Sequence, residues 1–221
     1  MAAIGITVEA AEYDAWYDTP RGRWIGEREF RLLSHHVSPK AENNVLDVGC
    51  GTGWFTRRLP RQPGPNVTGL DVDARALAFA RSRDVLSNYV LGDALQLPFE
   101  DESFDLVISI AALCFIRNWP AALSEIVRVC RGRFAIGLLN RHSLLWRQKG
   151  QDGGTGAYRG AHWHTAREVG GVLGTLPAHH VRMKYAIFLP SGSAAAQLLE
   201  SCVPASLPFG SFLLVVGSKR H

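Results

Sequence analysis

The residues with the clearest chemical potential are Val45–Gly53, VLDVGCGTG, where an apolar run passes directly into alternating glycines. Glycines at positions 49, 51 and 53 lack Cβ atoms, so the turn can be tight and a ligand can approach the backbone closely. Residues 54–59 read as a helix whose free amides would point toward the same ligand. The segment therefore predicts a strand followed by a ligand-binding loop.

The spacing of the glycines narrows the kind of ligand. A dinucleotide fingerprint, G-x-G-x-x-G, would require glycine where the chain has Trp54, whose bulk is poorly suited to an approaching pyrophosphate. A phosphate-binding P-loop would need lysine and a hydroxyl residue after Gly53, and Trp54 and Phe55 stand there instead. What remains is D-x-G-x-G-x-G, from Asp47 to Gly53.

Two acids follow the next two apolar runs. Asp71 ends the run 66–71, and it falls 18 residues after Gly53, near the roughly 20-residue interval of a ribose-binding acid. A carboxylate at this place can accept hydrogen bonds from both ribose hydroxyls. Asp93 follows the third run and can accept from the exocyclic amine of adenine. If the loop holds an adenosyl ligand, both acids have a role.

In this order, these blocks resemble the class I S-adenosylmethionine-dependent methyltransferases over about residues 40–140. The resemblance is strongest to the small-molecule branch of the ubiquinone, menaquinone and biotin pathways. It implies S-adenosylmethionine as cofactor, S-adenosylhomocysteine as product, and a doubly wound, mostly parallel sheet of order 3-2-1-4-5-7-6 with the last strand antiparallel. The cofactor contacts it predicts are Asp47, Gly49, Cys50, Gly51, Gly53, Asp71, Val72, Asp93, Ala94, Ser109 and Tyr17.

Predicted strands and predicted helices alternate along the chain, which is typical of an α/β fold, and they must position these residues. We predict helices over 119–130, from apolar residues at three- and four-residue spacing, and over 166–174, from the capping box of Thr165 and Glu168. The predicted strands lie near 44–48, 66–71, 87–91, 104–110, 133–139, 181–188 and 211–217.

Length and composition favour one globular unit. With 221 residues and 47% apolar content, the chain can bury one sizeable core. We predict a helical cap over 1–40 and a methyltransferase domain over 41–221, with a glycine-rich insertion or lid at about 140–162.

The charge distribution and the cysteine spacing argue against a nucleic-acid-binding surface, a zinc knuckle and a disulfide framework. The net charge of +4 is spread, with no basic run longer than two residues, and the four cysteines form no C-x-x-C pair. No apolar stretch is long enough to span a membrane, and the start of the chain lacks the pattern of a signal peptide. A soluble cytoplasmic protein with free thiols is expected, and its oligomeric state stays open.

The segment after the fourth strand points to a small-molecule acceptor. Enzymes that methylate exocyclic base amines carry a Pro-Pro-aromatic block there, whereas this chain has Ser109-Ile110-Ala111-Ala112, so we predict no nucleic-acid partner. The same segment lacks the acids of a magnesium site, and no metal is predicted.

His162, His164 and Tyr158 are the catalytic candidates. The two histidines alternate around Trp163, so their imidazoles can face one side and serve as a base or bind a metal. The simpler interpretation is that one histidine orients the loop and the other is solvated. The predicted activity is an in-line methyl transfer to a small molecule. The alternatives are a non-catalytic adenosyl-ligand binder and a nicotinamide-dependent oxidoreductase, which Trp54 disfavours.

Overall fold

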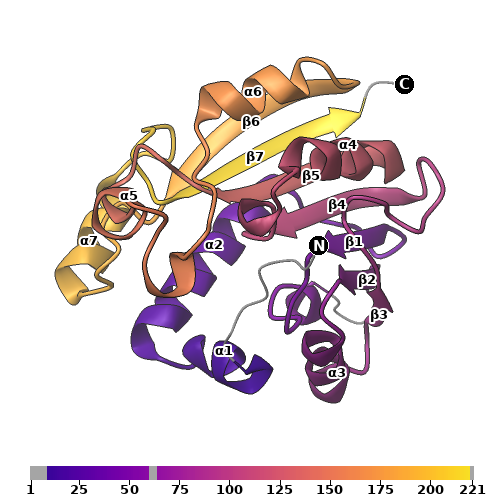
Figure 1. Ribbon diagram of the computed structural model, residues 1–221, viewed down its shortest axis with the longest axis horizontal. Coiled ribbons are helices and arrows are strands. Elements are labelled where there is room, and N and C mark those ends of the chain that lie inside the picture. The colour runs from indigo at the N-terminus through magenta and orange to yellow at the C-terminus, as the bar shows by residue number, and fades with distance from the viewer. Residues whose placement is uncertain (1–8, 60–63, 220–221) are drawn as a thin grey trace.

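A computed structural model describes residues 9–59 and 64–219 of the chain. Seven strands form one sheet of order β3-β2-β1-β4-β5-β7-β6 (Figure 1). Strand β7 is antiparallel to β5 and β6, and the pairs β3-β2, β2-β1, β1-β4 and β4-β5 are parallel. The predicted topology is confirmed. The strands are β1 (Asn44–Val48), β2 (Asn66–Asp71), β3 (Asn88–Leu91), β4 (Phe104–Ile110), β5 (Cys130–Leu139), β6 (Ala178–Ala186) and β7 (Phe212–Lys219).

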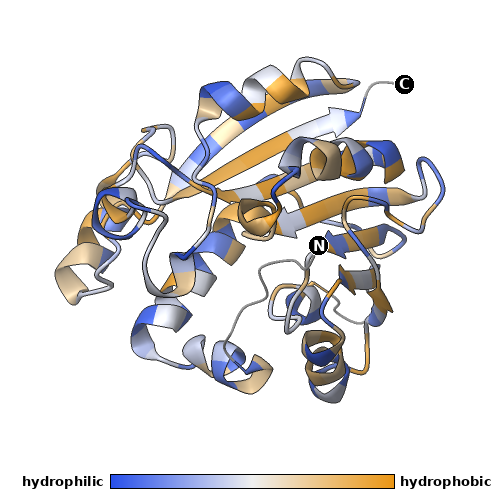
Figure 2. Ribbon diagram, in the orientation of Figure 1, coloured by the Kyte–Doolittle hydropathy of each residue, from blue (hydrophilic) through white to orange (hydrophobic). Residues whose placement is uncertain are grey.

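Helices cover both faces of this sheet (Figure 1). The helices are α1 (Ala10–Trp16), α2 (Pro20–His36), α3 (Ala74–Arg83), α4 (Trp119–Val129), α5 (Leu144–Lys149), α6 (Ala166–Leu173) and α7 (Ala194–Cys202). Figure 2 shows that the central strands are apolar along most of their length, as expected for strands buried on both faces. No helix in the described ranges is both long and apolar enough to cross a membrane.

The two larger apolar clusters pack helices against opposite faces of β4 and hold the layers together. Leu123 and Ile126 of α4 and Leu173 of α6 pack with Val107 of β4 in the first cluster. Ile25 and Leu33 of α2 pack with Leu106 and Ile108 in the second. Successive residues of β4 thus face opposite helices, which follows from the two-residue period of a strand.

The predicted capping box at the start of α6 is confirmed. The Thr165 hydroxyl accepts from the Glu168 N–H at 3.1 Å, and the Glu168 carboxylate accepts from the Thr165 N–H at 3.4 Å. These bonds satisfy amides that have no partner inside the helix. Helix α2 begins in a similar way, since the Thr19 hydroxyl accepts from the Gly22 N–H at 3.0 Å and Pro20 occupies the first turn.

The helix predicted over 54–59 is wrong. Only a 3₁₀ turn, η1 (Thr56–Arg58), forms there. Gly51 and Gly53 have φ of +53° and +77°, which keeps the preceding backbone out of the helical region, and Pro60 has no N–H with which to continue a helical ladder. The loop amides are therefore oriented by the turn itself and not by a helix.

The insertion at about 140–162 has structure of its own. It contains α5 and the 3₁₀ turn η3 (Gly156–Tyr158), and His164 just beyond it pairs with Asn140 in a parallel bridge. Within the predicted cap, 1–40, the structure has the helices α1 and α2, and residues 1–8 lie outside the described part of the chain. The division into cap and main domain stays a prediction.

Candidate cofactor and acceptor site

The loop after β1 is folded back onto β2. The N–H groups of Gly49 and Cys50 both donate to the Leu70 carbonyl, at 2.7 and 3.0 Å. A Cβ atom at Gly49 would collide with that of Ala112, and one at Gly53 would lie 2.6 Å from the Tyr89 hydroxyl. At Gly51, by contrast, a Cβ atom would meet no described atom within 4 Å. Two of the glycines are required by packing, and the third faces open space.

Asp71 joins this loop to the end of the neighbouring strand. Its Oδ2 accepts from the Gly51 N–H at 2.7 Å, and its Oδ1 accepts from the Asp73 N–H at 2.9 Å. Burial raises the pKa of Asp71, and the backbone donors of Asp73 and Gly51 partly offset that effect. A carboxylate has about four acceptor positions, so acceptor capacity remains for a ligand's hydroxyl groups. The structure thus brings Gly51 and Asp71 into direct contact, and their roles toward a cofactor stay predictions.

Asp47 lies beneath the loop. It is 1% exposed, and its Oδ2 accepts from the Thr56 hydroxyl at 2.7 Å. Burial raises the pKa of Asp47 to about 7, and the Thr56 hydrogen bond works in the opposite direction. This geometry makes Asp47 a support that ties the loop to η1.

The other predicted cofactor residues occupy different environments, and all except Tyr17, at the end of α1, lie at or just after the carboxyl ends of parallel strands. Asp93 is exposed after β3, and its Oδ1 accepts from the Leu95 N–H at 2.9 Å. Ser109 in β4 is buried, and its hydroxyl has no hydrogen-bond partner in the described residues. Cys50 is half-buried, Ala94 and Tyr17 are buried, and Val72 is exposed.

Helix α1 is fastened to the glycine loop by a buried carboxylate that the sequence did not single out. Asp14 accepts from the Thr52 hydroxyl at 2.9 Å and from the Arg57 guanidinium at 2.8 and 2.9 Å. Beside it, Tyr17 stacks on Trp54 with ring centroids 4.3 Å apart. Trp54 occupies the position where a dinucleotide-binding fingerprint would have glycine, and in this chain its ring packs against Tyr17 at the end of α1.

Glu29 in α2 is a second residue that sequence reasoning missed. Burial raises the pKa of its carboxyl to about 8. Tyr13, Tyr17 and Tyr158 lie close enough for its charge to raise the pKa of each phenol, although desolvation is the larger cause in all three. Tyr158 belongs to the insertion, so the insertion reaches the N-terminal cap. A single glutamate on an amphipathic helix gives no sequence signal for this arrangement.

The two predicted histidines do face one another, with ring centroids 4.5 Å apart. Nε2 of His162 lies 2.7 Å from Oε1 of Glu168. His164 is 0% exposed, and burial, with a smaller contribution from His162, lowers its pKa to about 3. Cys114 nearby is a buried thiol whose pKa burial raises to about 12, and its Sγ accepts from the Leu139 N–H at 3.2 Å.

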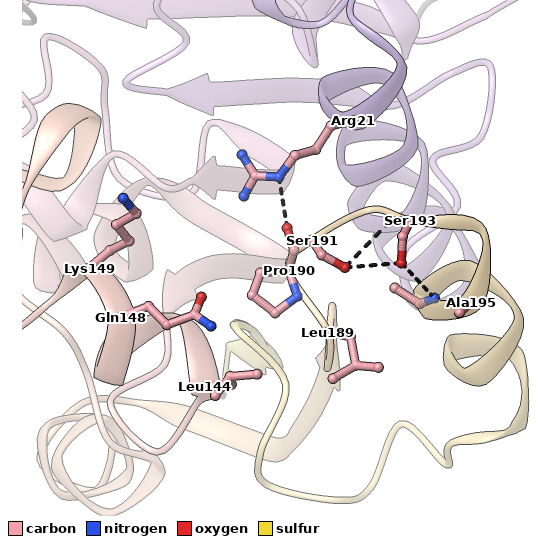
Figure 3. Close-up of a pocket in the computed structure, with 10 residues that line it drawn as sticks. Arg21, Leu144, Gln148, Lys149, Leu189, Pro190, Ser191, Ser193 and Ala195 are labelled. Carbon is pink, nitrogen blue, oxygen red and sulfur yellow. Dashed lines mark hydrogen bonds between the residues drawn. The ribbon is translucent and has the colours of Figure 1, made fainter.

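A cavity of about 330 Å³ lies between α2, α5 and the segment after β6 (Figure 3). Arg21 of α2 and Lys149 of α5 are among the residues that line it, and Nε of Arg21 donates to the Pro190 carbonyl at 2.7 Å. The remaining lining residues are Leu144, Gln148, Leu189, Pro190, Ser191, Ser193, Ala195 and Ala196. None of these described lining residues is acidic, so the cavity favours an anionic group.

Comparison with known proteins agrees with this geometry. Residues 46–135 match the methyltransferase domain family. In structure, the chain is similar to an S-adenosylmethionine-dependent methyltransferase of Thermotoga maritima, described as a possible histamine N-methyltransferase, with a TM-score of 0.79 and 23% identity over 95% of each chain. The structural neighbour has the same fold, and the domain match covers the part of the chain that holds the glycine loop, Asp71 and Asp93.

Individual relatives are found by sequence similarity. The chain is 37% identical, over 57% of its length, to the malonyl-[acyl-carrier protein] O-methyltransferase of Pectobacterium atrosepticum and 35% identical, over 63%, to that of Serratia marcescens. It spans about half of these relatives, 51% and 54% of their lengths. An uncharacterised protein of Mycobacterium bovis is 33% identical over 84% of this chain and 64% of its own.

Proposed function

We propose that the protein transfers the methyl group of S-adenosylmethionine to a small-molecule acceptor. The observation that carries this proposal is the open side of Gly51 next to the Asp71 carboxylate. A backbone free of side-chain atoms beside an acid with spare acceptor capacity suits the methionine and ribose portions of the cofactor. When bound, the cofactor supplies an electrophilic methyl group and leaves as S-adenosylhomocysteine.

The roles of the surrounding residues follow from their positions. We assign Asp71 and Val72 to the ribose, Asp93 and Ala94 to the adenine, and Gly49, Cys50, Gly51 and Gly53 to the methionine portion. Asp47 supports the loop from below, and Ser109 and Tyr17 border the sulfonium. Support for Ser109 comes from its buried hydroxyl, which has no partner in the described residues and so keeps a donor for a ligand.

We further propose an acceptor that carries a carboxylate. Arg21 and Lys149 in a cavity without acidic lining suit an anion. The names of the malonyl-[acyl-carrier protein] O-methyltransferase relatives make a malonyl thioester the first acceptor to test. The carboxylate oxygen forms a bond to the methyl carbon while the bond from that carbon to sulfur breaks, giving a methyl ester. An ionised oxygen needs no general base, so the catalytic roles predicted for His162, His164 and Tyr158 stay predictions.

Calorimetry tests the cofactor assignment. We expect wild-type protein to bind S-adenosylhomocysteine and not NAD, and Asp71→Ala to weaken that binding at least tenfold, about 1.4 kcal/mol. Loss of the carboxylate removes both a ligand acceptor and the anchor of the Gly51 amide. Asp101→Asn, in an exposed turn, is the matched control and should bind as wild type. Binding of NAD, or normal affinity in Asp71→Ala, would overturn the assignment.

Methyl transfer separates the enzyme from a non-catalytic binder. With S-adenosylmethionine and a malonyl thioester, mass spectrometry should detect the methyl ester and S-adenosylhomocysteine in equal amounts. Arg21→Ala should raise KM for the thioester about tenfold with unchanged cofactor affinity, since about 1.4 kcal/mol of charge-assisted contact is lost. Arg23→Ala, exposed on the same helix, should keep the wild-type KM. Equal KM values in both variants would exclude this acceptor cavity.

A further inference from the structure

Three side chains that can each ligate a metal ion converge near the start of α6, and the proposed transfer to an ionised carboxylate requires none of them as a base. His162, His164 and Glu168 each offer a ligand atom, and these three atoms lie within 4.8 Å of one another. We propose that this cluster is a zinc site in which two imidazoles and one carboxylate bind the ion and water completes the shell.

The backbone holds both histidines in place without any ion. The His162 N–H donates to the Cys114 carbonyl at 2.7 Å, after β4. The His164 N–H donates to the Leu139 carbonyl at 2.8 Å, at the end of β5. The 3₁₀ turn Leu113–Phe115 and the end of β5 therefore fix the spacing of the imidazoles, which lowers the cost of ordering them around an ion.

Glu168 is oriented by the capping box of α6. Its Oε2 accepts from the Thr165 N–H at 3.4 Å, which directs Oε1 toward Nε2 of His162 at 2.7 Å. With an ion present, Oε1 binds the metal while Oε2 keeps its backbone donor. A ligating carboxylate held by a backbone N–H is the outer-shell support that metal sites use.

His164 provides the observation that points to a ligand. Its side chain is 0% exposed, and neither Nδ1 nor Nε2 has a hydrogen-bond partner in the described residues. A neutral imidazole has one N–H donor and one nitrogen acceptor, and leaving both buried and unpaired is unfavourable because each loses its hydrogen bonds to water. The Trp119 ring packs against the His164 ring with centroids 4.8 Å apart. This apolar contact offers no hydrogen-bond partner to the nitrogens of His164. Coordination to an ion would satisfy one of them.

The ligand set favours zinc. Two histidines and one glutamate are a ligand set that zinc uses with water at the fourth position, at distances of about 2.0–2.2 Å. Side-chain exposures of 40% for His162 and 32% for Glu168 leave one side of the cluster open for that water. The ion would replace the direct contact between His162 and Glu168, and small side-chain movements would bring the three ligand atoms to its distance.

The test uses full-length protein without an affinity tag, stripped with a chelator and titrated with ZnCl₂ by calorimetry and with CoCl₂ by visible absorption. We expect one equivalent of either metal and the intense absorption of four-coordinate cobalt. Glu168→Gln keeps the capping box, because glutamine can replace glutamate at that position, but removes the anionic ligand. It should lose at least about tenfold in affinity, the lower end of losses from disturbed metal shells.

His162→Gln should show the same loss, and His142→Asn, an exposed histidine of the same segment, should bind zinc as wild type does. Circular dichroism melts of each variant establish that it is folded. Absence of stoichiometric binding to wild type would overturn the proposal. Equal affinity in wild type, Glu168→Gln and His162→Gln would overturn it as well, because the ion would then lie elsewhere. The cofactor titration is independent of these results.

Discussion

At the scale of single residues, the acids of the site do more than bind a ligand. Asp71 accepts from a loop amide, Asp47 from Thr56, and Asp14 from Thr52. Each bond fixes part of the backbone that must stay open around Gly51. The carboxylates thus shape the loop before any ligand arrives, which is the condition for tight binding at low ordering cost.

Asp47 predicts a pH dependence of stability. Its folded pKa of about 7 lies above the unfolded value of about 3.9. The stability linked to its proton is therefore complete below about pH 4 and is lost as the pH rises through about 7. Between pH 5 and 8, wild-type protein should lose about 2 kcal/mol more unfolding free energy than Asp47→Asn, which cannot titrate.

Urea unfolding at pH 5 and pH 8 measures this difference. Asp101→Asn, a change at an exposed turn, controls for the removal of one negative charge and should follow wild type. Parallel pH profiles for wild type and Asp47→Asn would show that burial does not perturb this carboxyl as described.

At the scale of elements, the attachment of α1 to the glycine loop depends on one carboxylate. Asp14 is 6% exposed, and both of its carboxylate oxygens accept from Nη2 of Arg57, whose side chain is 20% exposed. Removing one partner of such a pair leaves the other charge without compensation. The packing of Tyr17 on Trp54 depends on the same attachment, because both lie where α1 meets the loop.

We therefore expect Asp14→Ala to lower the unfolding free energy by about 2–3 kcal/mol, somewhat below the usual cost of breaking a fully buried pair. Binding of S-adenosylhomocysteine should weaken with it, because Thr52 in the loop loses its acceptor. Chemical denaturation and calorimetry measure the two effects. Glu12→Ala, exposed on the same helix, is the matched control. If Asp14→Ala and Glu12→Ala behave alike, the cap does not stabilise the loop.

The success of sequence reasoning differed between kinds of element. Apolar runs placed all seven strands, with ends that differ by up to three residues, and the capping box placed the start of α6. The helix expected over 54–59 failed because positive φ angles and a proline oppose it on either side. The periodicity of apolar residues predicts which side chains are buried, but it carries no information on positive φ angles or on the missing N–H of proline.

At the scale of the whole molecule, the parallel pairing of β1 and β2 assembles the cofactor site. Asp47 is in register with Gly69, so the ends of the two strands meet at one edge and Gly51 lies against Asp71. Residues far apart along the chain also meet, as Asp14 does with Arg57 beside the glycine loop and Arg21 does with Pro190 in the cavity. Of these contacts, only the one between Gly51 and Asp71 could have been predicted from the sequence, because it joins the ends of neighbouring strands in a recognised pattern.

The sequence by itself determined the glycine loop, the acids after the second and third strands, and the α/β class, because glycine spacing and apolar periodicity are local properties. Only the tertiary structure decided that Glu168 lies beside two histidines, that Asp14 reaches the loop, and that Arg21 and Lys149 line one cavity. Those contacts depend on how helices cross the sheet and how the insertion folds back. Such crossings arise from packing among distant side chains, which no short stretch of sequence encodes.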